Sequence, residues 1–138
     1  MALEGEPERA RLLFQQAWDS CRDDYEASIA AHFLARHQPT PDACLRWNAR
    51  AAQHAEAVTD GRTRGFKASL YLNLADAYLA VGDGAAAATT LATAREHVLA
   101  LPEGGYRAFV ERGIDGLQRR CDASQSRAPE QPGTSVTD

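Results

Sequence analysis

The chain has few aromatic and sulfur-containing side chains from which to build a core. Its 138 residues include two Trp, four Tyr, four Phe, one Met and three Cys. Three widely spaced cysteines argue against a disulfide framework, so we expect each thiol to pack in the core of a cytoplasmic protein. Hydrophobic residues still make up 44%, and many of them are alanine, the best helix former. The core is therefore expected to form by close approach of helices.

The sequence also lacks the features of membrane and nucleic-acid-binding proteins. It contains no apolar run of about eighteen residues and no basic and apolar leader at its start. Acidic residues outnumber basic ones by 19 to 15, for a net charge of -4. Such a chain has no basic footprint for phosphate backbones or anionic lipid. We therefore expect neither a nucleic-acid partner nor membrane association.

Motifs for catalysis or metal binding are missing as well. There is no glycine-rich phosphate loop after a strand, no G-x-S-x-G and no H-E-x-x-H. His32 and His37 are five positions apart and point to different sides of one helix, whereas His54 and His97 stand alone. An acidic group at a helix junction (Asp19, Asp23 and Glu26) is better explained by helix capping than by a cation. The sequence predicts no enzyme, no metal and no cofactor.

Helical periodicity is the main signal that is present. No segment has a strand pattern, so the predicted fold class is all-α with about six helices, arranged either as a closed bundle or as stacked helical hairpins. Residues 1–6 are expected to be an N-terminal extension and 7–121 a single helical domain. Residues 122–138 are rich in Ser, Pro, Gln and Thr and are expected to be a disordered tail. The predicted helices cover about 7–19, 21–37, 41–58, 69–81, 84–101 and 106–121.

Helix start and stop signals set most of these limits. Ser20 is expected to cap the second helix, unless that helix fuses with the first. Pro39 ends the second helix, and Thr40 and Pro41 begin the third. Apolar stripes are predicted on the first helix (Leu13, Phe14, Ala17, Trp18 and Cys21) and on the sixth (Tyr106, Val110, Ile114, Leu117 and Cys121).

Residues 69–101 carry the clearest pattern, a helical hairpin with a turn at Gly82-Asp83. The first arm repeats Tyr71, Leu74, Tyr78 and Val81, and the second repeats Ala87, Leu91, Ala94, Val98 and Leu101. This order of a small residue, a tyrosine, a Gly-Asp turn and then small and bulky residues closely resembles the tetratricopeptide repeat. The resemblance implies an antiparallel array of stacked helical hairpins, a short α-solenoid, rather than a closed bundle.

A weaker copy of the repeat runs from about residue 25 to residue 58. In it Cys44 and Ala51 stand where Ala87 and Ala94 stand, at an offset longer than the family period of about 34 residues. This spacing resembles the long-repeat versions found in bacterial regulators. His32 falls where a small crossing residue is expected, so the first two helices remain an alternative pair.

The resemblance implies a concave surface, made by the first helix of each pair, that binds peptides or protein partners. Asn73 falls where the family often uses an asparagine to bind a peptide backbone. Two purely structural alternatives remain. In one, Asn73 and Asp76 form hydrogen bonds with neighbouring helices. In the other, Leu72, Leu79 and Phe33 are core residues covered by the first helix. The implied binding residues are Ser69, Leu72, Asn73, Asp76 and Leu79, with Ile29, Phe33, Arg36 and His37, closed by Arg107 and Glu111.

Two classes of function remain, with self-association as a homodimer a third possibility. The preferred hypothesis is a non-enzymatic adaptor or regulator that binds a protein or peptide partner. The alternative is a helical bundle whose pocket, around His32, Trp47, Asn73 and Asp76, acts as an enzyme or binds a small ligand. An open groove lined by Leu72, Asp76 and Arg107 favours the first, and a closed cavity with converging titratable groups favours the second.

Overall fold

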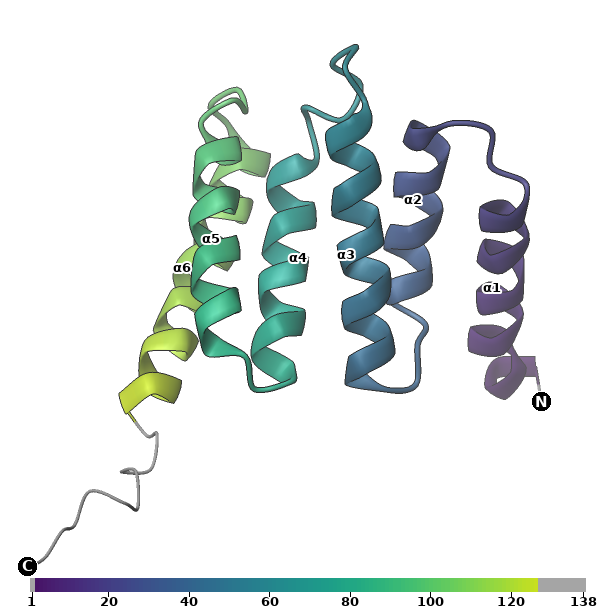
Figure 1. Cartoon of the computed structure of the whole chain (residues 1–138), viewed down its shortest axis with the longest axis horizontal. Helices are drawn as coiled ribbons and strands as arrows, with labels where there is room; N and C mark the ends of the chain where they lie inside the picture. Colours follow the sequence, from purple (N-terminus) through teal and green to yellow (C-terminus); the bar gives the residue numbers. More distant parts are fainter. Residues whose placement is uncertain (1, 127–138) are drawn as a thin grey trace, which may run out of the picture.

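The computed structural model describes the backbone of residues 2–126 and the side chains of residues 6–126 (Figure 1). Every regular element within this range is a helix, so the prediction of an all-α chain with about six helices is confirmed. The helices are α1 (Ala2–Asp19), α2 (Asp24–Ala35), α3 (Pro41–Ala57), α4 (Lys67–Ala80), α5 (Gly84–Val98) and α6 (Gly105–Ser126).

The helices follow one another side by side, and each runs antiparallel to the next (Figure 1). The closest pairs are α2 with α3 and α4 with α5, so of the two pairings left open for α2 the structure has the one with α3. α6 packs against both α5 and α4. As a result α2, α4 and α6 run in the same direction, and their N-terminal ends lie at the same end of the molecule.

Small residues allow the helices to approach closely. Ala75 of α4 and Ala87 of α5 are completely buried within the core cluster that α4, α5 and α6 share. Leu91 and Ile114 fill the space around them and are also fully buried. A second, smaller cluster joins α2, α3 and α4 around Ala31, Ala51, Ala55 and Leu70.

The turn between α4 and α5 has the predicted chemistry. Gly82 adopts φ +86, in the left-handed region that glycine occupies without steric cost. The side chain of Asp83 then accepts a hydrogen bond of 3.0 Å from the backbone N–H of Ala86 and caps α5. The helical hairpin predicted around Gly82-Asp83 is confirmed.

Several predicted helix ends are wrong, among them the end of α5, which lies at Val98 rather than at Leu101. α1 begins at Ala2 and includes the expected N-terminal extension, and Pro7 lies inside the helix, where it removes one backbone hydrogen bond without ending it. Ser20 donates back to the Gln16 carbonyl instead of capping α2, and Asp23 is the cap, accepting from the N–H of Glu26 at 2.8 Å. α2 ends at Ala35 rather than His37.

The C-terminal helix also differs from its prediction. α6 continues past Cys121 to Ser126, through the first residues of the expected tail. A side-chain hydrogen bond from Gln118 to Asp122, 3.0 Å long and one helical turn apart, supports this extension. The rest of the expected tail, 127–138, lies outside the described residues.

Several side chains of the predicted apolar stripes face solvent. Leu13 is 57% exposed and Ala17 is also exposed, because α1 turns Phe14 and Trp18 toward α2 and α3. Tyr106 at the start of α6 is 49% exposed. Of the cysteines only Cys121 is buried, while Cys21 and Cys44 are half-buried. Across residues 2–126, none of the helices combines the length and apolarity needed to span a membrane.

Candidate functional site

A groove runs between α2 and α4, parallel to both helices. It consists of two cavities, of about 660 Å³ and about 330 Å³. The smaller is lined by residues along α2 from Tyr25 to Phe33 and by residues at the start of α4, and the larger by the C-terminal end of α2 and the later part of α4. His32 lines both cavities, which therefore lie next to each other. We call this feature the α2–α4 groove.

The smaller cavity is the apolar end of the groove. Five of its seven lining side chains are aromatic or aliphatic, and Ser69 and His32 supply the polar atoms. All of them are at least half-buried. The apolar lining residues are Tyr25, Ile29 and Phe33 from α2, Phe66 from the N-cap of α4, and Leu70.

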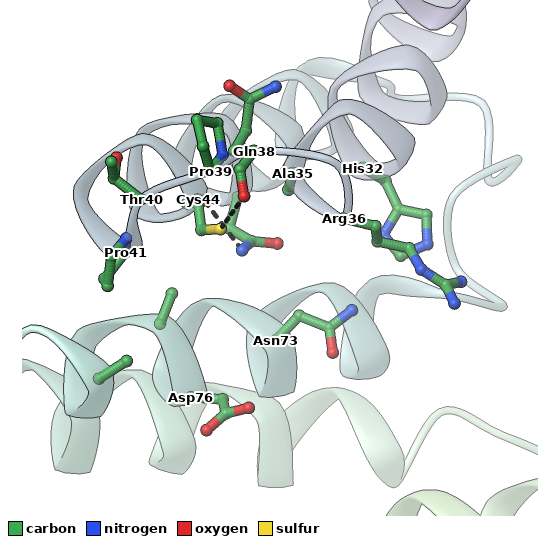
Figure 2. A pocket seen from close by; sticks show the side chains of 13 residues that line it. His32, Ala35, Arg36, Gln38, Pro39, Thr40, Pro41, Cys44, Asn73 and Asp76 are labelled. Atoms are coloured by element: carbon green, nitrogen blue, oxygen red, sulfur yellow. Dashed lines mark hydrogen bonds between the residues drawn. The ribbon is translucent and has the colours of Figure 1, made fainter. Parts of the chain in front are cut away.

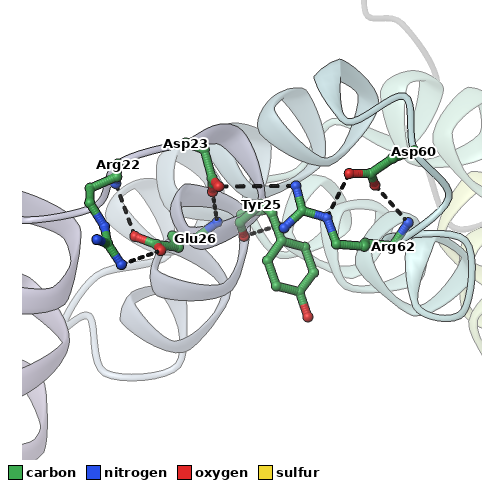
Figure 3. Close-up of polar contacts among 7 residues, drawn as sticks. Arg22, Asp23, Tyr25, Glu26, Asp60 and Arg62 are labelled. Atoms are coloured by element: carbon green, nitrogen blue, oxygen red, sulfur yellow. Dashed lines mark hydrogen bonds and ion pairs between the residues drawn. The ribbon is translucent and has the colours of Figure 1, made fainter.

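An ion-pair network holds Tyr25 at this end (Figure 3). The Arg62 guanidinium lies 4.5 Å from the centre of the Tyr25 ring and donates to Asp60 at 2.8 Å. It also lies 4.0 Å from Asp23, the cap of α2. The hydrogen bonds from Arg62 lower the pKa of the Asp60 carboxyl, so this carboxylate stays charged. The network joins the start of α2 to the loop before α4, and so fixes the walls of the apolar end.

The larger cavity is the polar end of the groove (Figure 2). Arg36 of α2 and Asn73 and Asp76 of α4 line it. Ala77 and Ala80 of α4 also line this cavity, and their small side chains leave the space between α2 and α4 unfilled. Arg36, Asp76 and Ala80 are exposed, so this end opens to solvent. The turn between α2 and α3, with Gln38, Pro39, Thr40 and Pro41, and the α3 residues Cys44 and Asn48 complete the lining.

Asn73 and Asp76 differ in their partners. The Asp76 carboxylate accepts a hydrogen bond of 3.1 Å from Arg120 of α6, which agrees with the alternative that it bonds to a neighbouring helix. The Asn73 side chain forms no hydrogen bond with any other of the described residues. Half-buried in a groove, its amide has a donor and an acceptor available for a ligand.

His32 lies where the two ends meet. Its Nδ1 atom is buried and has no hydrogen-bond partner within the described part of the chain. Burial lowers the pKa of the His32 imidazole, and the positive charge of Arg36, one turn along α2, lowers it further. His32 is therefore neutral at neutral pH, and the junction of the groove carries no charge.

We expect His32 to make the protein less stable in mild acid. Because its pKa in the folded chain lies below the reference value of 6.5, the unfolded chain takes up a proton that the folded chain resists. Its contribution to the free energy of unfolding is complete above pH 6.5 and is lost as the pH falls toward the lowered pKa. Urea unfolding at several pH values should show a shallower acid decline in His32→Gln than in wild type. Equal declines in the two proteins would contradict this role.

The structure brings together six of the residues that sequence reasoning assigned to binding. Two of the six, Asp76 and Arg36, stand at the exposed edge of the groove, and the others are half-buried. The six are Ile29, Phe33 and Arg36 from α2 and Ser69, Asn73 and Asp76 from α4.

The other five lie outside the groove. Leu72 packs so closely on α6 that a Cβ atom at Gly113 would lie 2.8 Å from its Cδ2, and Leu79 packs on the same core cluster. His37 stacks on Phe14 of α1, with ring centres 5.6 Å apart. On α6, Arg107 donates to the Leu101 carbonyl at 3.2 Å and pairs with Glu111 at 3.4 Å. Leu72, Asp76 and Arg107 were predicted to line an open groove together. Of the three, only Asp76 lines the α2–α4 groove.

α1 does not close the groove. Phe14 stacks on Phe33 with ring centres 4.9 Å apart, and Trp18 meets Trp47 of α3 edge to face at 5.0 Å. These contacts place α1 on the side of α2 away from α4 (Figure 1). Among the described side chains, those that line the two cavities come from α2, α3, α4 and the connections next to them.

Sequence reasoning missed several residues that shape the groove. None of Tyr25, Phe66 and Arg120 was assigned to binding from the sequence. An aromatic residue at the start of two parallel helices is a detectable signal for Tyr25 and Phe66. The pairing of Arg120 with Asp76 joins residues far apart in the chain and had no such signal.

His54 and His97 do not stand alone, contrary to expectation. His54 lies 2.8 Å from Asp24 and packs on Trp18. His97 stacks on Tyr71, and Glu56 accepts a hydrogen bond of 2.9 Å from the Tyr71 hydroxyl. Burial and the neighbouring Glu56 raise the pKa of Tyr71. The His54 contacts join α1, α2 and α3, and the His97 and Tyr71 contacts join α3, α4 and α5; none of these residues lines the groove.

Comparison with known proteins adds no relative. No protein-family model matches the chain, and no significant match is found to a curated protein or to a solved structure.

Proposed function

We propose that this protein is a non-enzymatic interaction module that binds a peptide or a segment of a protein partner in the α2–α4 groove. The observation that carries the proposal is the groove itself, whose two adjacent cavities share His32, open to solvent at Arg36 and Asp76, and are apolar at the other end. A site with an apolar cavity at one end, for a side chain of the ligand, and exposed polar groups at the other end is suited to an elongated ligand.

The free amide of Asn73 supports the same function. An extended peptide needs donors and acceptors along a groove for its backbone, and Asn73 offers both from the middle of α4. The resemblance of the α4–α5 hairpin to the tetratricopeptide repeat is consistent with this role, since stacked hairpins of that family present their first helices to peptides. On this proposal the chain is a cytoplasmic adaptor or regulator built as a short helical array.

The test is a double substitution in the groove. We expect Asn73→Ala with Asp76→Ala to abolish capture of the partners that co-purify with wild type from its own host, identified by mass spectrometry. The thermal midpoint and helical content should stay nearly unchanged. The ion pair of Asp76 with Arg120 is more than half exposed on both sides, and such pairs stabilise a fold by about 0–1 kcal/mol.

A matched control variant separates binding from folding. Asp115→Ala breaks a similar exposed pair, with Arg95 at 3.3 Å, and Gln53→Ala removes an exposed amide on α3. This control should capture the same partners as wild type. The proposal fails if both variants capture equally, if the groove variant unfolds, or if the chain purifies without a partner but with a tightly held small molecule.

A further inference from the structure

The three parallel helices carry the same order of side chains along their length. Along α2 the lining changes from Tyr25, Ile29 and Phe33 to Arg36, and along α4 it changes from Phe66 and Leu70 to Asn73 and Asp76. α6 follows this order. The Tyr106 hydroxyl lies 3.4 Å from Ser69 of the apolar end, whereas Arg120 pairs with Asp76 of the polar end. Phe109, one turn after Tyr106, is 66% exposed. The surface that faces a ligand is therefore apolar at one end and charged at the other.

The charges at the polar end do not cancel. Asp76 is neutralised by Arg120, and His32 is held neutral by burial and by Arg36. Arg36 is exposed, and within residues 6–126 no carboxylate lies within ion-pairing distance of it. The polar end thus presents one guanidinium without a counter-charge, which favours an anionic group on the ligand.

The length of the groove limits the size of the ligand. Its lining residues on α2 run from Tyr25 to Arg36 and continue to Pro39 in the following turn. At 1.5 Å per helical residue this is a span of about 20 Å. An extended chain covers about 3.3 Å per residue, so about six residues fill the groove.

We propose that the α2–α4 groove selects an extended peptide segment of about six residues, with a bulky apolar side chain at one end and an acidic side chain at the other. The apolar side chain occupies the cavity lined by Tyr25, Phe66 and Leu70. The carboxylate pairs with Arg36, and Asn73 bonds to the backbone between them. This specificity rests on the proposed function of the groove as a peptide site.

A phage-displayed library of random octapeptides tests this specificity on the full chain. Wild type should enrich peptides with a glutamate or aspartate four to six positions from a bulky apolar residue. Arg36→Glu should enrich lysine or arginine at that position instead. Arg119→Glu, a charge reversal of an exposed arginine elsewhere on α6, should enrich the same peptides as wild type. For a synthetic wild-type peptide, changing the glutamate to glutamine should weaken binding by up to roughly fivefold.

The outcomes separate this inference from the proposed function. If the enriched peptides lack an acidic bias, or keep it on Arg36→Glu, the inferred specificity is wrong even when Asn73→Ala with Asp76→Ala abolishes their binding. If wild type enriches no peptide, or the Asn73 and Asp76 variant binds the same peptides equally, the proposed function fails as well. Peptides that reproduce a stretch of this chain, together with dimers in sedimentation, would assign the groove to a second copy and overturn the proposal.

Discussion

Leu91→Ala should lower the free energy of unfolding by about 2–5 kcal/mol. Leu91 is fully buried where α5 packs on α4, and it belongs to the cluster that also includes residues of α6. Its neighbours Ala87 and Ala94 are already small and completely buried, so they have no larger side chain that can move into the space left behind. The loss is a large part of the stability of a domain of this size, typically about 5–15 kcal/mol.

Urea unfolding followed by circular dichroism measures this change. Leu99→Ala is the matched control, because Leu99 lies one residue after α5 and is 70% exposed. We expect the control to change the free energy of unfolding by at most about 0.5 kcal/mol. Similar losses for the two leucines would show that the core is not where the α4–α5 hairpin places it.

Ala80→Trp should block the groove without unfolding the chain. Ala80 is the last residue of α4, is exposed, and lines the polar end of the groove. An indole at this position occupies the space that a peptide needs beside Asn73 and Asp76. We expect at least a roughly tenfold loss of affinity for a peptide enriched on wild type, which corresponds to about 1.4 kcal/mol of lost contacts.

The control for this block is an equal substitution on another face. Ala92→Trp introduces the same indole at an exposed position of α5, away from the groove. Fluorescence anisotropy with the labelled peptide should give the wild-type affinity for Ala92→Trp. Equal affinities for all three proteins would mean that the ligand binds elsewhere, and a lower thermal midpoint of Ala80→Trp alone would identify a folding defect.

The sequence was most informative where local chemistry determines the structure. Gly82 can adopt a positive φ and Asp83 can cap α5, and both signals act within a few residues. Thr40 likewise caps α3 as predicted, accepting from the Ala43 N–H at 3.1 Å. Competing local signals explain the errors near α2. Ser20 and Asp23 are both good caps, and the structure uses Asp23.

The candidate site was predictable only in part, because helix periodicity assigns a face but not its neighbour. Asn73, Asp76 and Arg36 were placed on the ligand side from their positions in the repeat. Leu72 was placed there too, but it packs on α6, where the absence of a side chain at Gly113 allows a close approach. Contacts of this kind depend on how α6 returns beside α4, and neither segment specifies that contact alone.

The most direct test of the groove is to map a bound peptide by nuclear magnetic resonance. A display-enriched peptide is titrated into the isotope-labelled full chain, and backbone amide shifts are followed in wild type and in Ala80→Trp. The proposed function predicts that the largest shifts fall on Ile29, His32, Arg36, Asn73 and Asp76, and that they disappear in Ala80→Trp. Shifts concentrated on the exposed residues of α3 and α5, or unchanged in Ala80→Trp, would contradict a peptide site between α2 and α4.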